Sequence, residues 1–83
     1  MDTINRLITE VWLKIFFKYL GRRHPQILIT LLLDLDLTKR QIQIMCLRYI
    51  SRLSWDEVVV KVNYEKRNVM LLHKDCINKF ISL

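Results

Sequence analysis

The sequence predicts an all-α protein in which five helices form a single domain over residues 1–83. Three observations lead to this fold class. The chain contains only one Gly and one Pro, whereas an all-β domain needs turn residues about every 8–12 positions. Hydrophobic residues make up 52% of the chain, which is enough for one core with some apolar surplus. Apolar side chains also recur at helical spacing through most of the sequence.

The first helix is expected from Thr3 to Leu20. Asp2 or Thr3 can cap its start, and Gly21 can end it in a left-handed conformation. Its main apolar stripe consists of Ile4, Leu7, Ile8, Val11, Ile15 and Phe16. Three aromatic side chains lie off this stripe and either pack against another helix or stay exposed: Trp12, Phe17 and Tyr19.

The second helix is expected to begin at Pro25, because proline is favoured at the first position of a helix. It continues to Leu33, and Asp34 and Asp36 end it. Its residues are apolar nearly all round, which is typical of a central helix contacted on several sides. Together the first two helices make an N-terminal helical pair over residues 1–36.

Two capping boxes mark the next helix starts. Thr38 is followed three residues later by Gln41, and Ser54 is followed in the same way by Glu57. In each pair the two side chains can satisfy backbone N–H groups at the helix start. The third helix is therefore expected from Lys39 to about Arg52, and its inward stripe is Ile42, Met45, Cys46, Tyr49 and Ile50.

A short fourth helix is expected from Trp55 to about Val62, and a fifth from Glu65 to about Ile81. Asn63-Tyr64 forms the turn between them, since Asn tolerates left-handed geometry. A short helix, a tight turn and a longer basic helix give the outline of a helix-turn-helix over residues 37–83.

The fifth helix has two distinct faces. Its core stripe is formed by Val69, Leu72, Cys76 and Phe80, is widened by Met70, Ile77 and Ile81, and has His73 at its edge as a structural histidine. The opposite face carries Lys66, Arg67, Asn68, Leu71, Lys74 and Asn78. Major-groove reading uses Arg or Lys on guanine or phosphate and Asn on adenine. Leu71 suits either a thymine methyl group or a protein contact.

Positive charge is concentrated in the second half. The formal net charge is +6; residues 1–36 hold five basic and four acidic side chains, and residues 37–83 hold nine basic and four acidic ones. Such a basic half is typical of a partner for a polyanion.

Several other functions are not expected. No nucleophile lies at a useful spacing from a base, so the sequence predicts no enzyme and no cofactor. Cys46, Cys76, His24 and His73 do not have zinc-ligand spacing, so no metal site is expected. The sequence shows neither a signal peptide nor a membrane span, so we expect reduced thiols and a cytoplasmic location.

The stretch from Leu37 to Phe80 resembles region 4 of bacterial sigma factors, and is most similar to the small sigma-like regulators encoded by phages of Gram-positive bacteria. The residues that carry the resemblance are Leu37-Thr38-Lys39-Arg40-Gln41, Leu47-Arg48-Tyr49-Ile50, Leu53-Ser54-Trp55-Asp56-Glu57-Val58, Arg67-Asn68-Val69 and His73. The resemblance implies a regulator that binds promoter DNA, with RNA polymerase as a further partner. It also implies phosphate contacts at Ser54 and Trp55, and major-groove contacts from Lys66, Arg67, Asn68 and Lys74.

Three residues depart from that family pattern: Val59, Glu65 and Leu71. They keep a second hypothesis open, in which the fold serves as a protein-binding module, such as a phage inhibitor or adaptor of a host protein like RNA polymerase. A homodimer is compatible with both hypotheses, and the first helix is its candidate interface.

Overall fold

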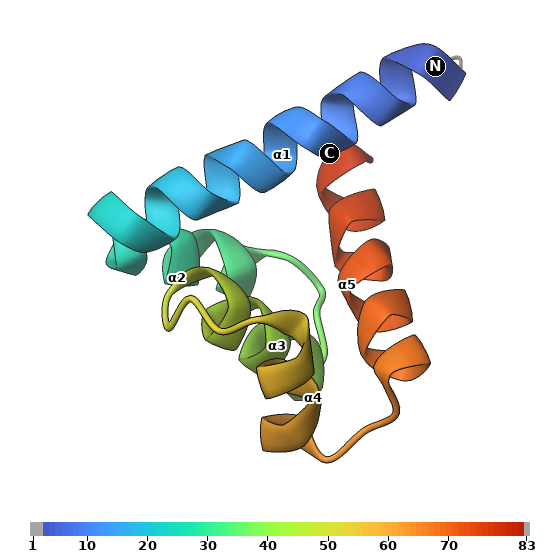
Figure 1. The fold of residues 1–83 in the computed structure, drawn as a ribbon. Coiled ribbons are helices and arrows are strands. Elements are labelled where there is room, and N and C mark those ends of the chain that lie inside the picture. Colours follow the sequence, from blue (N-terminus) through green and yellow to red (C-terminus); the bar gives the residue numbers. More distant parts are fainter. Residues whose placement is uncertain (1–2, 83) are drawn as a thin grey trace.

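The computed structural model describes residues 3–82, and this part of the chain contains five α-helices and no strand. The helices are α1 (Thr3–Arg23), α2 (Pro25–Asp34), α3 (Lys39–Tyr49), α4 (Trp55–Val62) and α5 (Lys66–Ile81). Figure 1 shows α1 lying across one side of the molecule, with the other four helices on its opposite side. The all-α single domain expected from the sequence is confirmed. None of the helices in this part of the chain is long and apolar enough to cross a membrane.

The helix starts agree with the sequence analysis because local hydrogen bonds define them. The Thr38 hydroxyl accepts from the Gln41 N–H at 3.1 Å, and the Thr38 N–H donates to Gln41 Oε1 at 3.0 Å. Ser54 and Glu57 form the same reciprocal pair at 3.2 and 3.0 Å. Asn63 ends α4 in the left-handed region with a φ of 56°. These bonds fix the starts of α3 and α4 through side chains only three residues apart.

The end of α1 differs from the prediction. The helix continues through Gly21 to Arg23, and Gly21 has no positive φ. A Cβ atom at Gly21 would lie 2.0 Å from the carbonyl oxygen of Tyr49. The predicted role of Gly21 as a helix stop is therefore wrong, because this glycine instead lets the α1 backbone approach the end of α3. A helix cap at Asp2 lies outside the described residues.

The buried face of α1 also differs from the prediction. The six residues of the expected apolar stripe are all exposed, whereas Phe17, Leu20 and Gly21 are buried. The Phe17 ring lies 5.5 Å from the ring of Tyr49 and 4.7 Å from that of Phe80, measured between centroids. Large apolar residues occupy most sides of α1, so helical spacing alone could not identify the side that packs.

The central helix is α3 rather than α2. Helix α3 contacts all four other helices, whereas α2 contacts only α1 and α3. Ile27 and Leu33 of α2 are 50% and 64% exposed, so the prediction of a central α2 is wrong. Helix α3 itself ends at Tyr49 instead of the expected Arg52, which takes a left-handed φ of 58° in the following connection.

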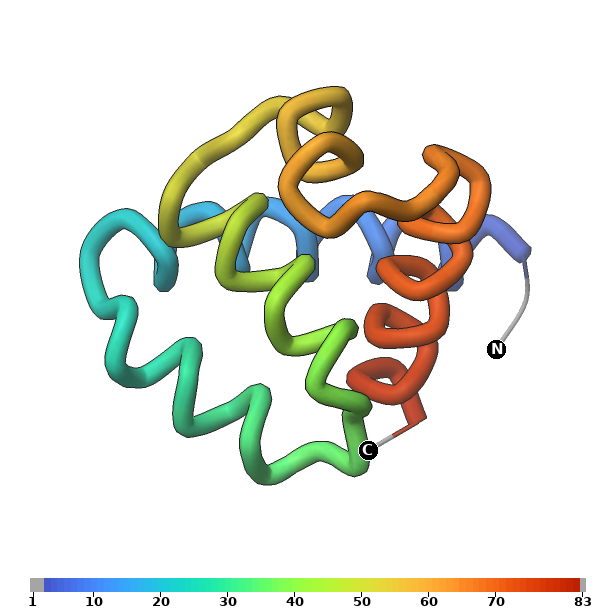
Figure 2. The backbone as a smooth tube through the Cα atoms, turned by 90° about the horizontal axis from the view of Figure 1, so that it is seen from below, coloured from blue at the N-terminus to red at the C-terminus, as the bar shows by residue number. Residues whose placement is uncertain are grey.

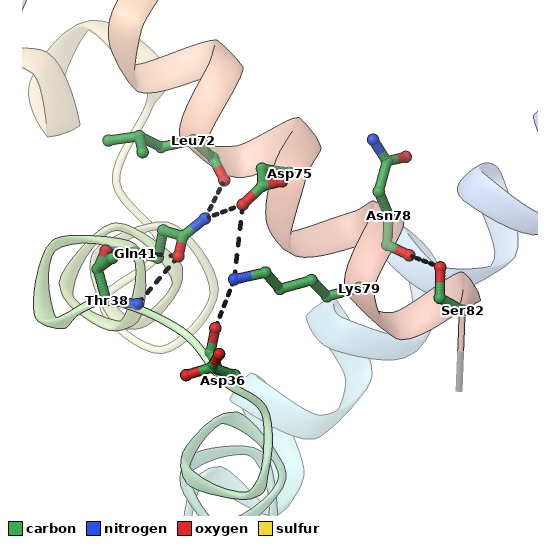
Figure 3. Close-up of polar contacts among 8 residues, drawn as sticks. All are labelled: Asp36, Thr38, Gln41, Leu72, Asp75, Asn78, Lys79 and Ser82. Carbon is green, nitrogen blue, oxygen red and sulfur yellow. Dashed lines mark hydrogen bonds and ion pairs between the residues drawn. The ribbon is translucent and has the colours of Figure 1, made fainter.

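Helix α5 buries or half-buries the predicted stripe except Met70, which is exposed, and is held to α3 by a polar cluster (Figure 3). Gln41, only 2% exposed, donates through Nε2 to Asp75 Oδ2 at 2.7 Å and to the Leu72 carbonyl at 3.3 Å. Lys79 Nζ lies 3.7 Å from the same Asp75 oxygen and donates to the carbonyl of Asp36. The cluster thus joins α5 to the start of α3 and to the chain just before it. Figure 2, in which the molecule is seen from below, shows α3 and α5 side by side in front of α1.

Candidate nucleic-acid interface

The outer face of α5 presents most of the predicted DNA-binding residues to solvent. Lys66, Arg67, Asn68, Leu71 and Lys74 are all exposed. Lys66 Nζ lies 2.9 Å from Asp56 Oδ1, in an ion pair between two solvent-exposed side chains. Arg67, Asn68 and Lys74 form no side-chain hydrogen bond or ion pair within residues 3–82. The first two turns of α5 are therefore accessible to a ligand.

Asn78 belongs to a different environment. It is half-buried, and its Oδ1 accepts a hydrogen bond from the Arg6 guanidinium of α1. Its backbone carbonyl accepts from the Ser82 hydroxyl at 3.0 Å (Figure 3). The amino-terminal part of α1 thus covers the C-terminal part of α5, and Asn78 is not brought together with the other predicted residues.

Ser54 and Trp55 already have partners within the protein. The Ser54 hydroxyl is engaged in the capping box with Glu57. The Trp55 ring lies 4.6 Å from the ring of His73, and the guanidinium of Arg48 lies 4.8 Å above it. Arg48 also donates through Nη1 to the Leu53 carbonyl at 2.9 Å. Trp55 therefore acts mainly as a packing surface that holds Arg48 in place.

A cavity of about 610 Å³ lies between the C-terminal parts of α1 and α3. We call it the arginine cleft; it is lined by Lys18, Tyr19, Arg22, Arg23, Arg48, Tyr49 and Arg52. Five of these seven residues are cationic and none carries a carboxylate. Because no acidic side chain lines the cleft, its positive charge is available to an anion from solution.

A second hollow, of about 220 Å³, lies between α1 and α5 and is lined by Lys14 and Lys74 together with Glu10, which forms an ion pair with Arg6 at 3.7 Å. The buried pair Tyr49 and His73 separates it from the arginine cleft, and the Tyr49 hydroxyl lies 2.7 Å from His73 Nε2. Burial, together with the cations Lys14 and Arg48, lowers the pKa of His73 to about 4. Burial also raises the pKa of Tyr49. Both side chains are therefore neutral at pH 7, and their hydrogen bond places no negative charge beneath the cations.

The arginine cleft, the second hollow and the outer face of α5 together form one positively charged region, which we call the basic surface. Its cations are Lys14, Lys18, Arg22, Arg23, Arg48, Arg52, Arg67 and Lys74. Only the last two of these cations were predicted from the sequence as site residues. The missing signal was the spacing of Lys14, Lys18 and Arg22, which are four residues apart and so form one stripe along α1.

The chemistry of the basic surface is that of anion binding. Within residues 3–82 no three His, Cys, Asp or Glu side chains are placed to hold a metal ion. No protein-family model matches this chain, and neither a curated protein nor a solved structure matches it significantly. Fold and surface together define a small all-α protein with a basic region in which no carboxylate lines the arginine cleft and one, Glu10, lines the second hollow.

Proposed function

We propose that this protein is a transcription regulator of bacterial or phage type that binds double-stranded DNA. The observation that carries the proposal is the basic surface: five cations of α1, α3 and the segment after α3 line the arginine cleft without a carboxylate, and Arg67 and Lys74 are exposed on α5. A surface of this kind attracts the phosphate backbone of a nucleic acid by displacing its condensed counterions. The resemblance of residues 37–83 to sigma region 4 supports promoter DNA as the ligand and RNA polymerase as a further partner.

Within the basic surface, some side chains would read base edges and others would position the protein on the DNA backbone. Arg67, Asn68 and Lys74 lie on the exposed side of α5, where side chains of their types can reach base edges in the major groove. Arg48 and Arg52, in the arginine cleft, would contact phosphates, which orient a protein on the duplex without reading sequence. Asn78 is left out of the proposed interface because Arg6 occupies its amide oxygen.

The test is fluorescence anisotropy of the purified protein against labelled duplex DNA at about 50 and 200 mM salt, a range over which binding through several phosphate contacts weakens strongly. Two double variants divide the basic surface: Arg67→Ala with Lys74→Ala, and Lys18→Ala with Arg22→Ala. Each should lower affinity by about tenfold or more and reduce the salt dependence by roughly the two contacts removed.

A matched control removes the same charge elsewhere. Lys39→Ala with Lys61→Ala takes two exposed cations from outside the basic surface. This control should bind DNA nearly as tightly as the wild-type protein. Equal losses in all three double variants would mean that net charge alone drives binding, and an absence of binding at low salt would reject the proposal.

A second candidate function, protein binding, is favoured by apolar residues on the outer sides of α4 and α5. Val60 is 78% exposed and Leu71 is 55% exposed. Val60 and Leu53 line a shallow groove of about 380 Å³ on α4. An inhibitor or adaptor of RNA polymerase would bind the purified enzyme in high salt, and Val60→Asp with Leu71→Asp would abolish that binding. Binding that disappears in high salt, or survives both substitutions, would reject this function.

A further inference from the structure

The outer face of α1 is an uncovered apolar surface. We call it the α1 apolar face; it consists of Ile4, Leu7, Ile8, Val11, Trp12, Ile15, Phe16 and Tyr19. These side chains are between 44% and 70% exposed, and in Figure 1 no other helix lies on this side of α1. Contiguous apolar surface of this extent on a small protein marks an interaction site.

We propose that the α1 apolar face binds the same face of a second copy, forming an antiparallel homodimer with two-fold symmetry. The order of its residues supports this occupant. We place the two copies antiparallel, with the centre of the pair between Val11 and Trp12. Two residues, one from each copy, then lie at the same level when their numbers add up to 23. At each level one large residue is then matched by another: Ile4 with Tyr19, Leu7 with Phe16, Ile8 with Ile15, and Val11 with Trp12, with Ile8 and Ile15 in direct contact at the centre of the face and Leu7 and Phe16 at its two edges. An interface formed by identical patches requires this reciprocal pairing.

Charge selects the antiparallel arrangement over the parallel one. The α1 apolar face is bordered by Lys14, Lys18 and Arg22. A parallel pair would lay the two C-terminal halves of α1, each carrying these three cations, side by side at the same level, at a cost in repulsion. The antiparallel pair instead sets each of these halves beside the N-terminal half of the other copy, where Arg6 and Glu10 balance one another.

The exposed area is large enough for a dimer. At exposures of 44–70%, and with roughly 100–200 Å² for a whole side chain of these types, the α1 apolar face offers about 600 Å² in each copy. Two copies together would remove about 1,200 Å² from water, which reaches the lower end of the range for specific interfaces. The rim residues of both copies would add to this area.

Sedimentation equilibrium of the full chain over a range of concentrations tests the dimer. The wild-type protein should have twice the 10.1 kDa mass of one chain. Ile8→Glu and Ile15→Lys, each at a half-exposed position, should separately give folded monomers. The double variant with both changes should dimerise again, because in the antiparallel register each new glutamate faces a new lysine.

Leu33→Glu supplies the control, since Leu33 is an equally exposed apolar residue on α2 and should leave the mass unchanged. Circular dichroism confirms that each variant is folded. A wild-type protein that is monomeric at every concentration would overturn the proposal. So would a monomer that binds anionic phospholipid vesicles through this face. A double variant that stays monomeric would overturn the antiparallel register. High salt should leave the dimer intact while it weakens DNA binding, so the two proposals fail independently.

Discussion

Gly21 offers a sharp test of how α1 and α3 pack. In the interior of a helix, replacing Gly by Ala ordinarily stabilises a protein by about 1 kcal/mol. At Gly21 we expect the opposite sign. The new Cβ would lie 2.0 Å from the Tyr49 carbonyl oxygen and 2.5 Å from its carbon, whereas ordinary contact begins at 3.4 Å. The obstructing atoms belong to the backbone, so the two helices must move apart. The contact distance has to grow from 2.0 Å to at least 3.4 Å, which requires a shift of more than about 1 Å.

The size of the effect follows from these distances. Forcing extra atoms into a packed core costs about 1–3 kcal/mol, and a clash with backbone belongs at the upper end or beyond. After the helix-propensity gain is subtracted, Gly21→Ala should lower the free energy of unfolding by about 2 kcal/mol or more. For a domain of this size that corresponds to a fall in Tm of roughly 10–15 °C.

Urea denaturation followed by circular dichroism measures the change, at one fixed protein concentration. Lys18, an exposed position one turn earlier in α1, provides the matched comparison. Lys18→Ala should be more stable than Lys18→Gly, in the ordinary direction. If Gly21→Ala proved as stable as the wild-type protein, the close approach of α1 to Tyr49 would be refuted.

Three further predictions concern the polar groups of the fold. Arg52→Gly should raise stability by about 1 kcal/mol, because the left-handed φ of 58° is strained for arginine, yet weaken DNA binding several-fold relative to Arg52→Lys. The free energy of unfolding should fall by up to about 3 kcal/mol as the pH drops from about 6.5 to 4, because only the unfolded chain protonates His73 over that range. Urea unfolding at each pH measures this fall, which should be smaller in the variant that combines His73→Phe with Tyr49→Phe. Gln41→Glu should destabilise the protein at pH 7 by placing a carboxylate against Asp75, and adding Asp75→Asn should restore most of the loss.

The sequence predicts best what short-range chemistry decides. The two capping boxes and the left-handed Asn63 fixed helix boundaries correctly, because their partners are at most a few residues apart. The buried stripe of α5 was also predictable, since its opposite face is polar. The ends of α1 and α3 were not: α1 continues past Gly21, whose role is its close approach to Tyr49, and α3 ends at Tyr49, ahead of the left-handed Arg52.

The face of α1 could not be predicted for a different reason. Its inner side combines Phe17 and Leu20 with the polar residues Arg6 and Glu10, which form an ion pair at 3.7 Å, while a longer apolar stripe faces outward. Hydrophobic periodicity ranks the outward stripe higher and therefore selects the wrong side. The same limitation hid part of the basic surface, because counting charge along the sequence assigns the α1 cations to a nearly neutral half.

If α1 pairs as proposed, the dimer and the basic surface are geometrically linked. The two-fold axis of an antiparallel helix pair is perpendicular to the plane that contains both helices. A given side of α1 therefore lies on the same flank of the pair in both copies. Lys14 and Lys18 border the α1 apolar face on one flank, and both basic surfaces would then face the same side of the dimer. One DNA duplex could contact both copies, as in dimers that bind two half-sites.

This linkage predicts that Ile8→Glu weakens binding to a long duplex although residue 8 lies outside the basic surface. Losing the second contact should reduce affinity by about 10²-fold or more on a duplex that spans both copies. On a duplex of about 10 bp, which spans roughly one half-site, the loss should be small. Adding Ile15→Lys restores both the net charge and the pairing, so anisotropy should show long-duplex binding recovered. Equal weakening on both duplexes would instead assign the effect to the added charge, and DNA binding would then need only one copy.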